Sequence, residues 1–316
     1  FAALATFALW PPSISSASFS AWAGLAYVGL ISQYMAFFVF NAAMAIGGLP
    51  SMMDLRTARP AYGSPEASLH SAAAVDLARH LGIPAVTYEF NDQREQIWLA
   101  QNSSIMQQDT DYIVNARCHL PITDEMFERV ADLENARRGA RVWGKSKRLW
   151  QYVSSQGAQE TRALLKLDDR PVVMLAANVL GDSLTLGRDI FAASMTEWIT
   201  KTVQYFAKRT DVQLVIRVHP GERLVPQAKS MGTVVREALP EMPSHIHVIG
   251  ALDNVNTYDL IEIADVGLAY TTTVGLETAM NGRPVISCGQ THYRARGFTL
   301  DPQMGIAPRT QSIAAR

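Results

Sequence analysis

The sequence lacks charge over its first 53 residues, because no aspartate, glutamate, lysine or arginine occurs before Asp54. The chain as a whole has a net charge of -1 and 18% charged residues, which provides no excess of positive charge for binding nucleic acid. Only two cysteines occur, Cys118 and Cys288, and they are far apart in the sequence. This cysteine usage is typical of a reducing compartment and argues against a disulfide framework or a zinc site.

Several short motifs that mark nucleotide binding or catalysis are also missing. The sequence contains no GxxxxGK[ST], no GxGxxG, no GxSxG, and no cysteine and histidine at metal-ligand spacing. We therefore expect no metal site. A phosphate group would have to be held by helix N-termini and side chains.

The uncharged N-terminal segment, residues 1–50, is predicted to contain one or two transmembrane-type helices. Its stretch from Ala23 to Leu49 exceeds the roughly 20 residues that a helix needs to cross a bilayer. Arg56 and Arg59 follow this stretch, and the positive-inside tendency then places the rest of the chain at the cytoplasmic face of the inner membrane. The alternative is a buried helix of a soluble protein.

The segment 1–50 also resembles the C-terminal end of an EamA-type drug/metabolite transporter. In that family a “GLxYxGLxSQYxxFxxxNxAxxxGG”-like helix occurs near the end of a many-helix carrier, and “GLAYVGLISQYMAFFVFNAAMAIGG” matches it. One or two spans cannot form a transport pathway by themselves. The chain begins with Phe1 rather than methionine, so we expect a fragment or an unusual fusion.

The rest of the chain alternates strand-type and helix-type segments. Residues 51–64 are turn-rich and are predicted to be a junction, followed by a partial α/β domain over 65–165 and a second α/β domain over 166–316. Five short apolar runs of the second domain are predicted strands: PVVMLAA, VQLVIRV, IHVIG, DVGLAY and PVISC. Because helical patterns separate them, we expect a parallel sheet covered on both faces.

The partial domain is predicted to begin with a helix and a strand over 66–90. Residues 93–108 are predicted to be helical, and residues 124–153 to form a longer charged helix whose arginines and lysines lie on a solvated face. In the second domain, an amphipathic helix is predicted from Asp189, with these core residues: Phe191, Met195, Trp198 and Val203.

Polar residues follow three of the predicted strands at their carboxyl ends. They are Asn178, Gly181, Asp182 and Ser183 after the first, Arg217, His219 and Glu222 after the second, and Thr271, Thr272, Thr273 and Gly275 after DVGLAY. In open parallel sheets, ligands bind beyond the carboxyl ends of the strands. The convergence of three polar clusters therefore predicts a ligand site at this edge.

Each cluster also has a purely structural interpretation. The first can be a turn with helix caps, Arg217 can pair with a core carboxylate, and the threonines can be simple capping residues. The functional interpretation uses the same helix N-terminus to hold an anion. Glu277, one turn into that helix, then suits the hydroxyls of a ribose or sugar, and His219 suits a phosphate or a nucleobase.

The segments “RVHPGE”, “TTTVGLETAMNGRPVI” and “THYRARGFTLDP”, in this order, resemble a capsule-polysaccharide-type glycosyltransferase of GT-B fold. The resemblance covers roughly residues 65–302. It implies an α/β protein whose C-terminal domain, 166–316, is a GT-B-like, Rossmann-type parallel sheet that binds a nucleotide-sugar donor. The N-terminal α/β half, 65–165, is shorter than this fold usually needs, so we expect it to be truncated.

The resemblance also implies roles for individual residues. His219 and Glu222 would lie at the donor, the turn from Thr271 to Gly275 would take its phosphate, and Glu277 would take its ribose. The cleft opposite the donor phosphates would be lined by His292, Tyr293 and Arg294. No cofactor is required, because helix dipoles and basic side chains stabilise the leaving phosphate. The general base would come from the N-terminal domain, with these candidates: Glu89, Asp92 and Glu95.

We therefore expect a glycosyltransferase that adds a sugar from a nucleotide-sugar donor to a growing capsule or surface polysaccharide. Its partners would be the donor, a glycan acceptor and the membrane through residues 1–50, without nucleic acid. A sugar-nucleotide epimerase or polyol-phosphate transferase shares this architecture and is an alternative. A further alternative is a transporter fragment that carries an inactive nucleotide-binding passenger.

Overall fold

The computed structural model describes residues 75, 86–90, 97–103, 105–141, 150–185, 187–190, 192–224 and 229–302. The predicted transmembrane-type helices of residues 1–50 lie outside these ranges, as do the base candidates Asp92 and Glu95. Among the residues that are described, no helix has the length and apolar character needed to cross a bilayer.

Five parallel strands form the central sheet, in the order β5-β4-β3-β6-β7, so the predicted parallel sheet is confirmed. The strands are β3 (Val172–Ala176), β4 (Gln213–Arg217), β5 (Ile246–Ile249), β6 (Val266–Ala269) and β7 (Val285–Ser287). Each lies within one of the five apolar runs of the sequence. The strand order reverses between β3 and β6, which is the kind of position where α/β sheets bind ligands.

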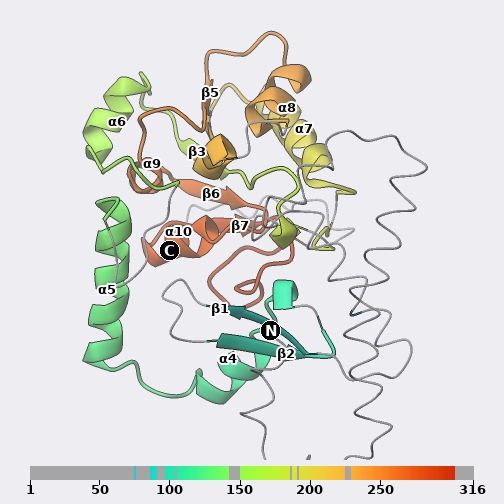
Figure 1. The fold of residues 1–316 in the computed structure, drawn as a ribbon. Helices are drawn as coiled ribbons and strands as arrows, with labels where there is room; N and C mark the ends of the chain where they lie inside the picture. The colour runs from blue at the N-terminus through green and yellow to red at the C-terminus, as the bar shows by residue number, and fades with distance from the viewer. Residues whose placement is uncertain are drawn as a thin grey trace, which may run out of the picture.

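Helices cover both faces of this sheet (Figure 1). On one face α7 packs against α8, and on the other α6 packs against α9, while α10 contacts β6 and β7. Their bounds are α6 (Ala158–Leu164), α7 (Met195–Phe206), α8 (Met231–Ala238), α9 (Thr257–Ile263) and α10 (Val274–Met280). The result is a three-layer α/β domain.

The two helical layers enclose two separate hydrophobic cores. Side chains of consecutive strand residues point to opposite faces, so β3 supplies Leu175 to the core under α7 and α8, and Met174 to the core under α9. The predicted core residues of α7 are confirmed, since Met195, Trp198 and Val203 are all buried in the first of these cores. Phe191 lies outside the described residues.

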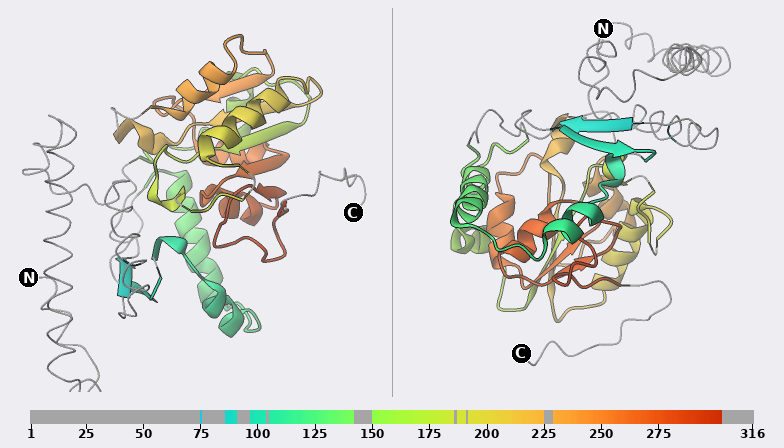
Figure 2. Two further views of the ribbon diagram at one scale, coloured as in Figure 1. Left: turned by 90° about the vertical axis from the view of Figure 1, so that its right-hand side faces the viewer. Right: turned by 90° about the horizontal axis from the view of Figure 1, so that it is seen from below.

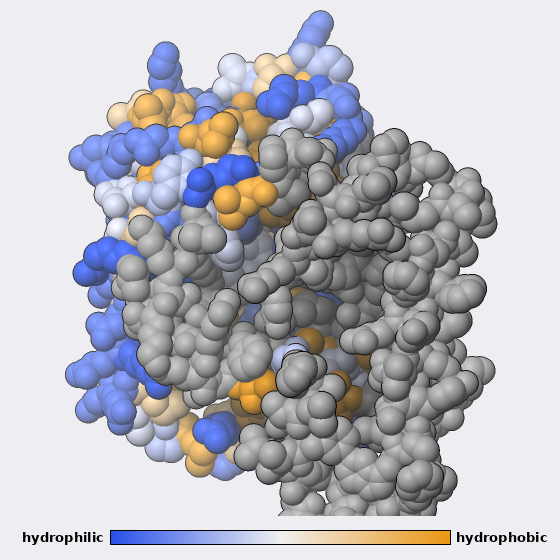
Figure 3. All heavy atoms as spheres, viewed as in Figure 1, coloured by the Kyte–Doolittle hydropathy of each residue, from blue (hydrophilic) through white to orange (hydrophobic). Residues whose placement is uncertain are grey.

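The N-terminal part contains a small antiparallel sheet of β1 (Val86–Phe90) and β2 (Ile97–Gln101). The prediction of a helix over 93–108 is therefore wrong at β2. Exposure alternates residue by residue along β2, which is the two-residue period of a strand. Among the described residues of 93–108, the chain turns helical in the short 3-10 helix η4 (Ile105–Gln107) and nowhere else. Hydrophobic side chains are exposed over β1 and β2 (Figure 3).

A longer helix, α5 (Asp124–Arg138), follows the short helix α4 (Asp111–Arg117). The predicted helix over 124–153 is therefore too long: α5 stops at Gly139, and Ala140 adopts a φ of 50°, outside the helical region. The side chain of Thr123 caps its N-terminus. The N-terminal end of α5 extends away from the sheet, whereas its C-terminal end reaches the α/β domain (Figure 2).

Candidate functional site

The first and third polar clusters meet where β3 and β6 end side by side. Asn178 Oδ1 accepts a hydrogen bond from the backbone N–H of Thr271, at 3.3 Å. Thr271 is only 1% exposed, and its hydroxyl oxygen has no hydrogen-bond partner among the described residues. Because a buried polar atom without a partner is costly, this hydroxyl is a candidate contact for a ligand.

The start of α10 is built around Tyr293, which belongs to the loop after β7. The Tyr293 hydroxyl donates to the carbonyl oxygen of Thr272 at 2.7 Å, and Thr272 Oγ1 accepts from the backbone N–H of Val274 at 3.3 Å. Thr273 is the N-cap residue of α10 but makes no side-chain cap. Thr272 therefore fulfils part of the capping role, and the Thr271 to Gly275 turn keeps its predicted place at a strand end.

Glu277 lies just inside α10 and is only 8% exposed. Its Oε1 accepts from Arg137 Nη1 at 2.5 Å, which joins α10 to the end of α5. Arg138, the next residue, bonds to Asn281 at the C-terminal end of α10. The prediction of a solvated basic face on α5 is therefore wrong for these two arginines, because tertiary docking turns them toward α10.

Arg217 lies at the end of β4 and is buried. Its Nη1 donates to the carbonyl oxygen of Gly250 at 2.6 Å, and its Nε contacts Thr257 Oγ1 at 3.5 Å. Burial lowers the pKa of Arg217 to about 10. These contacts connect the ends of β4 and β5 to α9, so Arg217 acts as a tie between strand ends rather than as the partner of a core carboxylate.

His219 precedes the 3-10 helix η6 (Pro220–Leu224). Its Nδ1 accepts from the backbone N–H of Gly221 at 2.9 Å, which places the ring proton of the neutral form on Nε2. A Cβ at Gly221 would lie 2.7 Å from this nitrogen, so glycine is needed here. The imidazole ring also lies 6.0 Å, between centroids, from the ring of Trp150.

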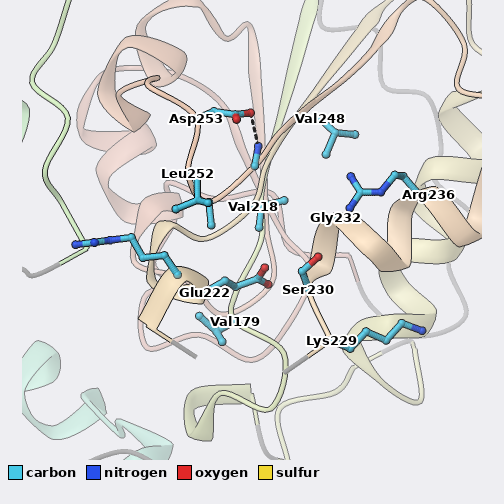
Figure 4. A pocket seen from close by; sticks show the side chains of 13 residues that line it. Val179, Val218, Glu222, Lys229, Ser230, Gly232, Arg236, Val248, Leu252 and Asp253 are labelled. Atoms are coloured by element: carbon cyan, nitrogen blue, oxygen red, sulfur yellow. Dashed lines mark hydrogen bonds between the residues drawn. The ribbon is translucent and has the colours of Figure 1, made fainter. Parts of the chain in front are cut away.

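A cavity of about 520 Å³ opens between η6, the start of α8 and the segment after β5 (Figure 4). Its walls include Val179, Val218, Glu222, Ser230, Val248 and Leu252. Glu222 Oε1 accepts from the backbone N–H of Met231 at 2.9 Å, while its Oε2 is buried without a hydrogen-bond partner in the described part of the chain. Burial raises the pKa of Glu222. The cavity thus combines apolar and charged walls with the incompletely satisfied carboxyl group of Glu222; the charged residues are Arg223, Lys229, Arg236 and Asp253.

The three residues that follow Thr291 in “THYR” make different contacts: they are His292, Tyr293 and Arg294. Tyr293 supports the start of α10, as described above. Arg294 bonds to the backbone carbonyls of Ser287 and Pro302 and holds its own loop in place. His292 Nδ1 is buried without a hydrogen-bond partner among the described residues, and its pKa is lowered by burial and by the nearby Arg188 and Arg296.

Arg188, a buried cation near His292, is a candidate site residue that the sequence did not indicate. It is only 3% exposed, and its Nη1 lies 3.2 Å from the carbonyl oxygen of Gln290 and 3.4 Å from Gln108 Oε1. Burial lowers its pKa. The loop “TLGR” gave no signal for this position, because the contacts come from segments about 80 and 102 residues away.

The remaining predicted residues make local structural contacts, and their functional roles stay predictions. Gly181 adopts a φ of 77°, and Asp182 Oδ1 accepts from the backbone N–H of Leu184, which stabilises the 3-10 helix η5 (Ser183–Thr185). Glu89 lies in β1. The assignment of the general base to Glu89, Asp92 or Glu95 stays a prediction.

No curated protein matches the chain at a significant level. Among solved structures, the beta Kdo 2,4 transferase of Thermosulfurimonas dismutans KpsC is 18% identical, with 73% of this chain and 69% of that chain covered and a TM-score of 0.45. The beta Kdo 2,7 transferase of the same protein is 19% identical, with 49% and 46% covered and a TM-score of 0.32. UDP-GlcNAc 2-epimerase from Neisseria meningitidis, bound to UDP-GlcNAc, is 13% identical, with 41% and 30% covered and a TM-score of 0.28.

These structural similarities are too weak to assign an activity. The family described as “Capsule polysaccharide biosynthesis protein” matches residues 102–314, which is more than half of the chain. The match includes all five strands of the parallel sheet but not residues 1–50, whose likeness to a transporter stays a prediction. The chain belongs to the capsule polysaccharide biosynthesis protein family.

Proposed function

We propose that this protein is a glycosyltransferase that transfers a sugar from a nucleotide-sugar donor to a growing capsule or surface polysaccharide. Family membership supports a role in capsule synthesis. The observation that carries the proposal is the contact of Asn178 with Thr271 at the point where the strand order reverses. Ligands of open α/β sheets bind at such positions.

On this proposal the donor lies along the carboxyl edge of the sheet. The turn from Thr271 to Gly275 binds its phosphate, Glu277 binds its ribose, and His219 and Glu222 border it from the β4 side. Arg188 lies near His292, and its positive charge would stabilise the leaving phosphate. The lowered pKa of His292 favours its neutral ring, which would contribute a hydrogen bond rather than charge. Helix ends and side chains then suffice for this step, and the transfer requires no cofactor.

In this proposal, the N-terminal α/β part of the chain, residues 65–165, binds the acceptor and supplies the general base. A base removes the proton of the attacking hydroxyl group, and Glu89, Asp92 and Glu95 remain its candidates. Attachment to the cytoplasmic face of the inner membrane through residues 1–50 would bring the enzyme to a polysaccharide under assembly.

Thermal unfolding with and without nucleotide tests the donor site. CMP, UDP and GDP are each added at millimolar concentration to the whole chain and to Glu277→Ala. A ligand at 100 times its Kd stabilises a protein by about 2.7 kcal/mol, which corresponds to roughly 4 °C in Tm for a chain of 316 residues. We expect one nucleotide to raise the Tm of the unsubstituted protein and to lose most of this effect on Glu277→Ala.

Glu128→Ala is the matched control, because Glu128 is an exposed glutamate of α5. It should respond to nucleotide like the unsubstituted protein. The donor site is wrong if none of the three nucleotides stabilises the protein, or if Glu277→Ala responds as strongly as Glu128→Ala. Product analysis with a sugar nucleotide separates the reactions: transfer releases the nucleotide and extends a glycan, whereas epimerisation leaves an altered sugar on the nucleotide.

A further inference from the structure

The C-terminal end of α5 is anchored to the α/β domain by Arg138. Its Nη2 donates to Asn281 Oδ1 at 2.5 Å, and its guanidinium lies 5.6 Å from the ring centroid of Tyr258 in α9. The carbonyl oxygen of Arg138 accepts from Asn256 Nδ2 at 3.0 Å, and the same amide nitrogen donates to the carbonyl oxygen of Val153 at 2.6 Å. Side-chain and backbone contacts together therefore hold this helix end on α9 and α10.

This anchor places the side chain of the preceding residue, Arg137, against Glu277. The two side chains are 19% and 10% exposed, so the ion pair is largely shielded from water. The carbonyl oxygen of Arg137 accepts hydrogen bonds from Ala140 N, at 3.1 Å, and from Gln151 Nε2. The Arg137 backbone is thus held in place independently of its ion pair. Arg138 supplies the docking of α5, and Arg137 brings a cation to the carboxylate of Glu277.

We propose that Arg137 is a positioning residue that orients Glu277 to bind the ribose hydroxyls of the donor. The inference rests on the proposed function, because it assigns a second residue to the same donor site. A carboxylate has about four acceptor positions, so a guanidinium and a hydroxyl group can bond to it together. Hydrogen bonds to an ionised acceptor are stronger than those to a neutral one, and an acceptor already held in its binding orientation loses less conformational freedom when the ligand binds. Arg137 therefore contributes to ribose recognition through Glu277.

The affinity difference between a ribonucleotide and its 2′-deoxy counterpart tests this role. The probe is whichever of CMP, UDP and GDP binds the whole chain most tightly, compared with dCMP, dUDP or dGDP by titration calorimetry. The unsubstituted protein should prefer the ribonucleotide, and Glu277→Ala should lose this preference. Arg137→Met should bind the ribonucleotide about tenfold more weakly, with the deoxynucleotide affected less than twofold.

Arg138→Met is the matched control, since it removes the neighbouring guanidinium from the same helix end. It should lower the Tm but keep the preference for the ribonucleotide, because a purely structural tie does not affect that ratio. If Arg137→Met does not fold, Arg137→Lys decides the question. Lysine lacks the planar fork of arginine, so a reduced preference supports the proposal and an unchanged one overturns it.

The outcomes separate this inference from the proposed function. If no nucleotide binds the unsubstituted protein, the proposed function fails together with the inference. If a nucleotide binds and Arg137→Met keeps the full ribose preference, the inference fails and the donor site stands. Tighter ribonucleotide binding by Arg137→Met would also overturn it, because Arg137 would then compete with the ligand for Glu277.

Discussion

Substitution of Gly275 by alanine should destabilise the start of α10. Gly275 is the second residue of this helix, and an added Cβ would lie 2.2 Å from Tyr293 Oη and 2.8 Å from the Cβ of Ala269. Both neighbours resist displacement, since Ala269 belongs to β6 and Tyr293 is only 2% exposed. The Tyr293 hydroxyl would have to leave the carbonyl oxygen of Thr272, to which it donates at 2.7 Å.

The expected cost follows from these contacts. Overpacking of a buried site costs about 1–3 kcal/mol, and a buried hydroxyl or carbonyl that loses its partner costs about 1–3 kcal/mol. Alanine regains about 1 kcal/mol of helix propensity relative to glycine. We therefore expect Gly275→Ala to lower the free energy of unfolding by about 3 kcal/mol, which corresponds to roughly 4–5 °C in Tm for a protein of 316 residues.

Urea unfolding followed by tryptophan fluorescence measures this change, with Gly232→Ala as the control. Gly232 is the second residue of α8, but an added Cβ there would come no closer than 3.5 Å to its neighbours, an ordinary contact. Gly232→Ala should be neutral or more stable by up to about 1 kcal/mol. In Gly275→Ala combined with Tyr293→Phe, the nearest clashing atom is gone, so the combined cost should be smaller than the sum of the single costs. Equal stability of Gly275→Ala and Gly232→Ala would refute the reasoning.

Two further substitutions test buried carboxyl groups. Burial raises the pKa of Glu222 above its ordinary value of 4.5, so its contribution to stability falls as the pH rises from 4.5 through the raised folded pKa. Glu222→Gln should reduce this pH dependence in urea unfolding between about pH 4 and pH 7, and an unchanged slope would contradict the assignment. Asp259 is fully buried and accepts from Ser155 Oγ, from Gln156 N at 2.9 Å and from Thr161 Oγ1 at 3.3 Å. In Asp259→Asn, an NH₂ group replaces one of the carboxylate oxygens that accept these hydrogen bonds, so a donor then faces a donor. This substitution should lower the free energy of unfolding by about 2–3 kcal/mol. A loss below about 1 kcal/mol, measured by thermal unfolding, would contradict this role of Asp259.

The parallel sheet was predictable because its strands are short, apolar and buried on both faces. β3 is buried at all five positions, which matches its unbroken apolar run, and the intervening helix α7 shows the spacing that buries Trp198. β2 was not predictable in the same way. Its alternating pattern spans only five residues, and pairing with β1, rather than local preference, decides that it is a strand.

For the candidate site, the sequence alone determined which polar residues follow each strand, because the residues at a strand end are neighbours of the strand in the sequence. It also indicated threonine capping at the start of α10, a role that Thr272 fulfils in part. Only the tertiary structure decided which of these residues act together. Glu277 meets Arg137 from 140 residues away, and Arg188 meets Gln290 from 102 residues away. Such contacts depend on the strand order and on the docking of α5, where packing between distant segments outweighs any local pattern.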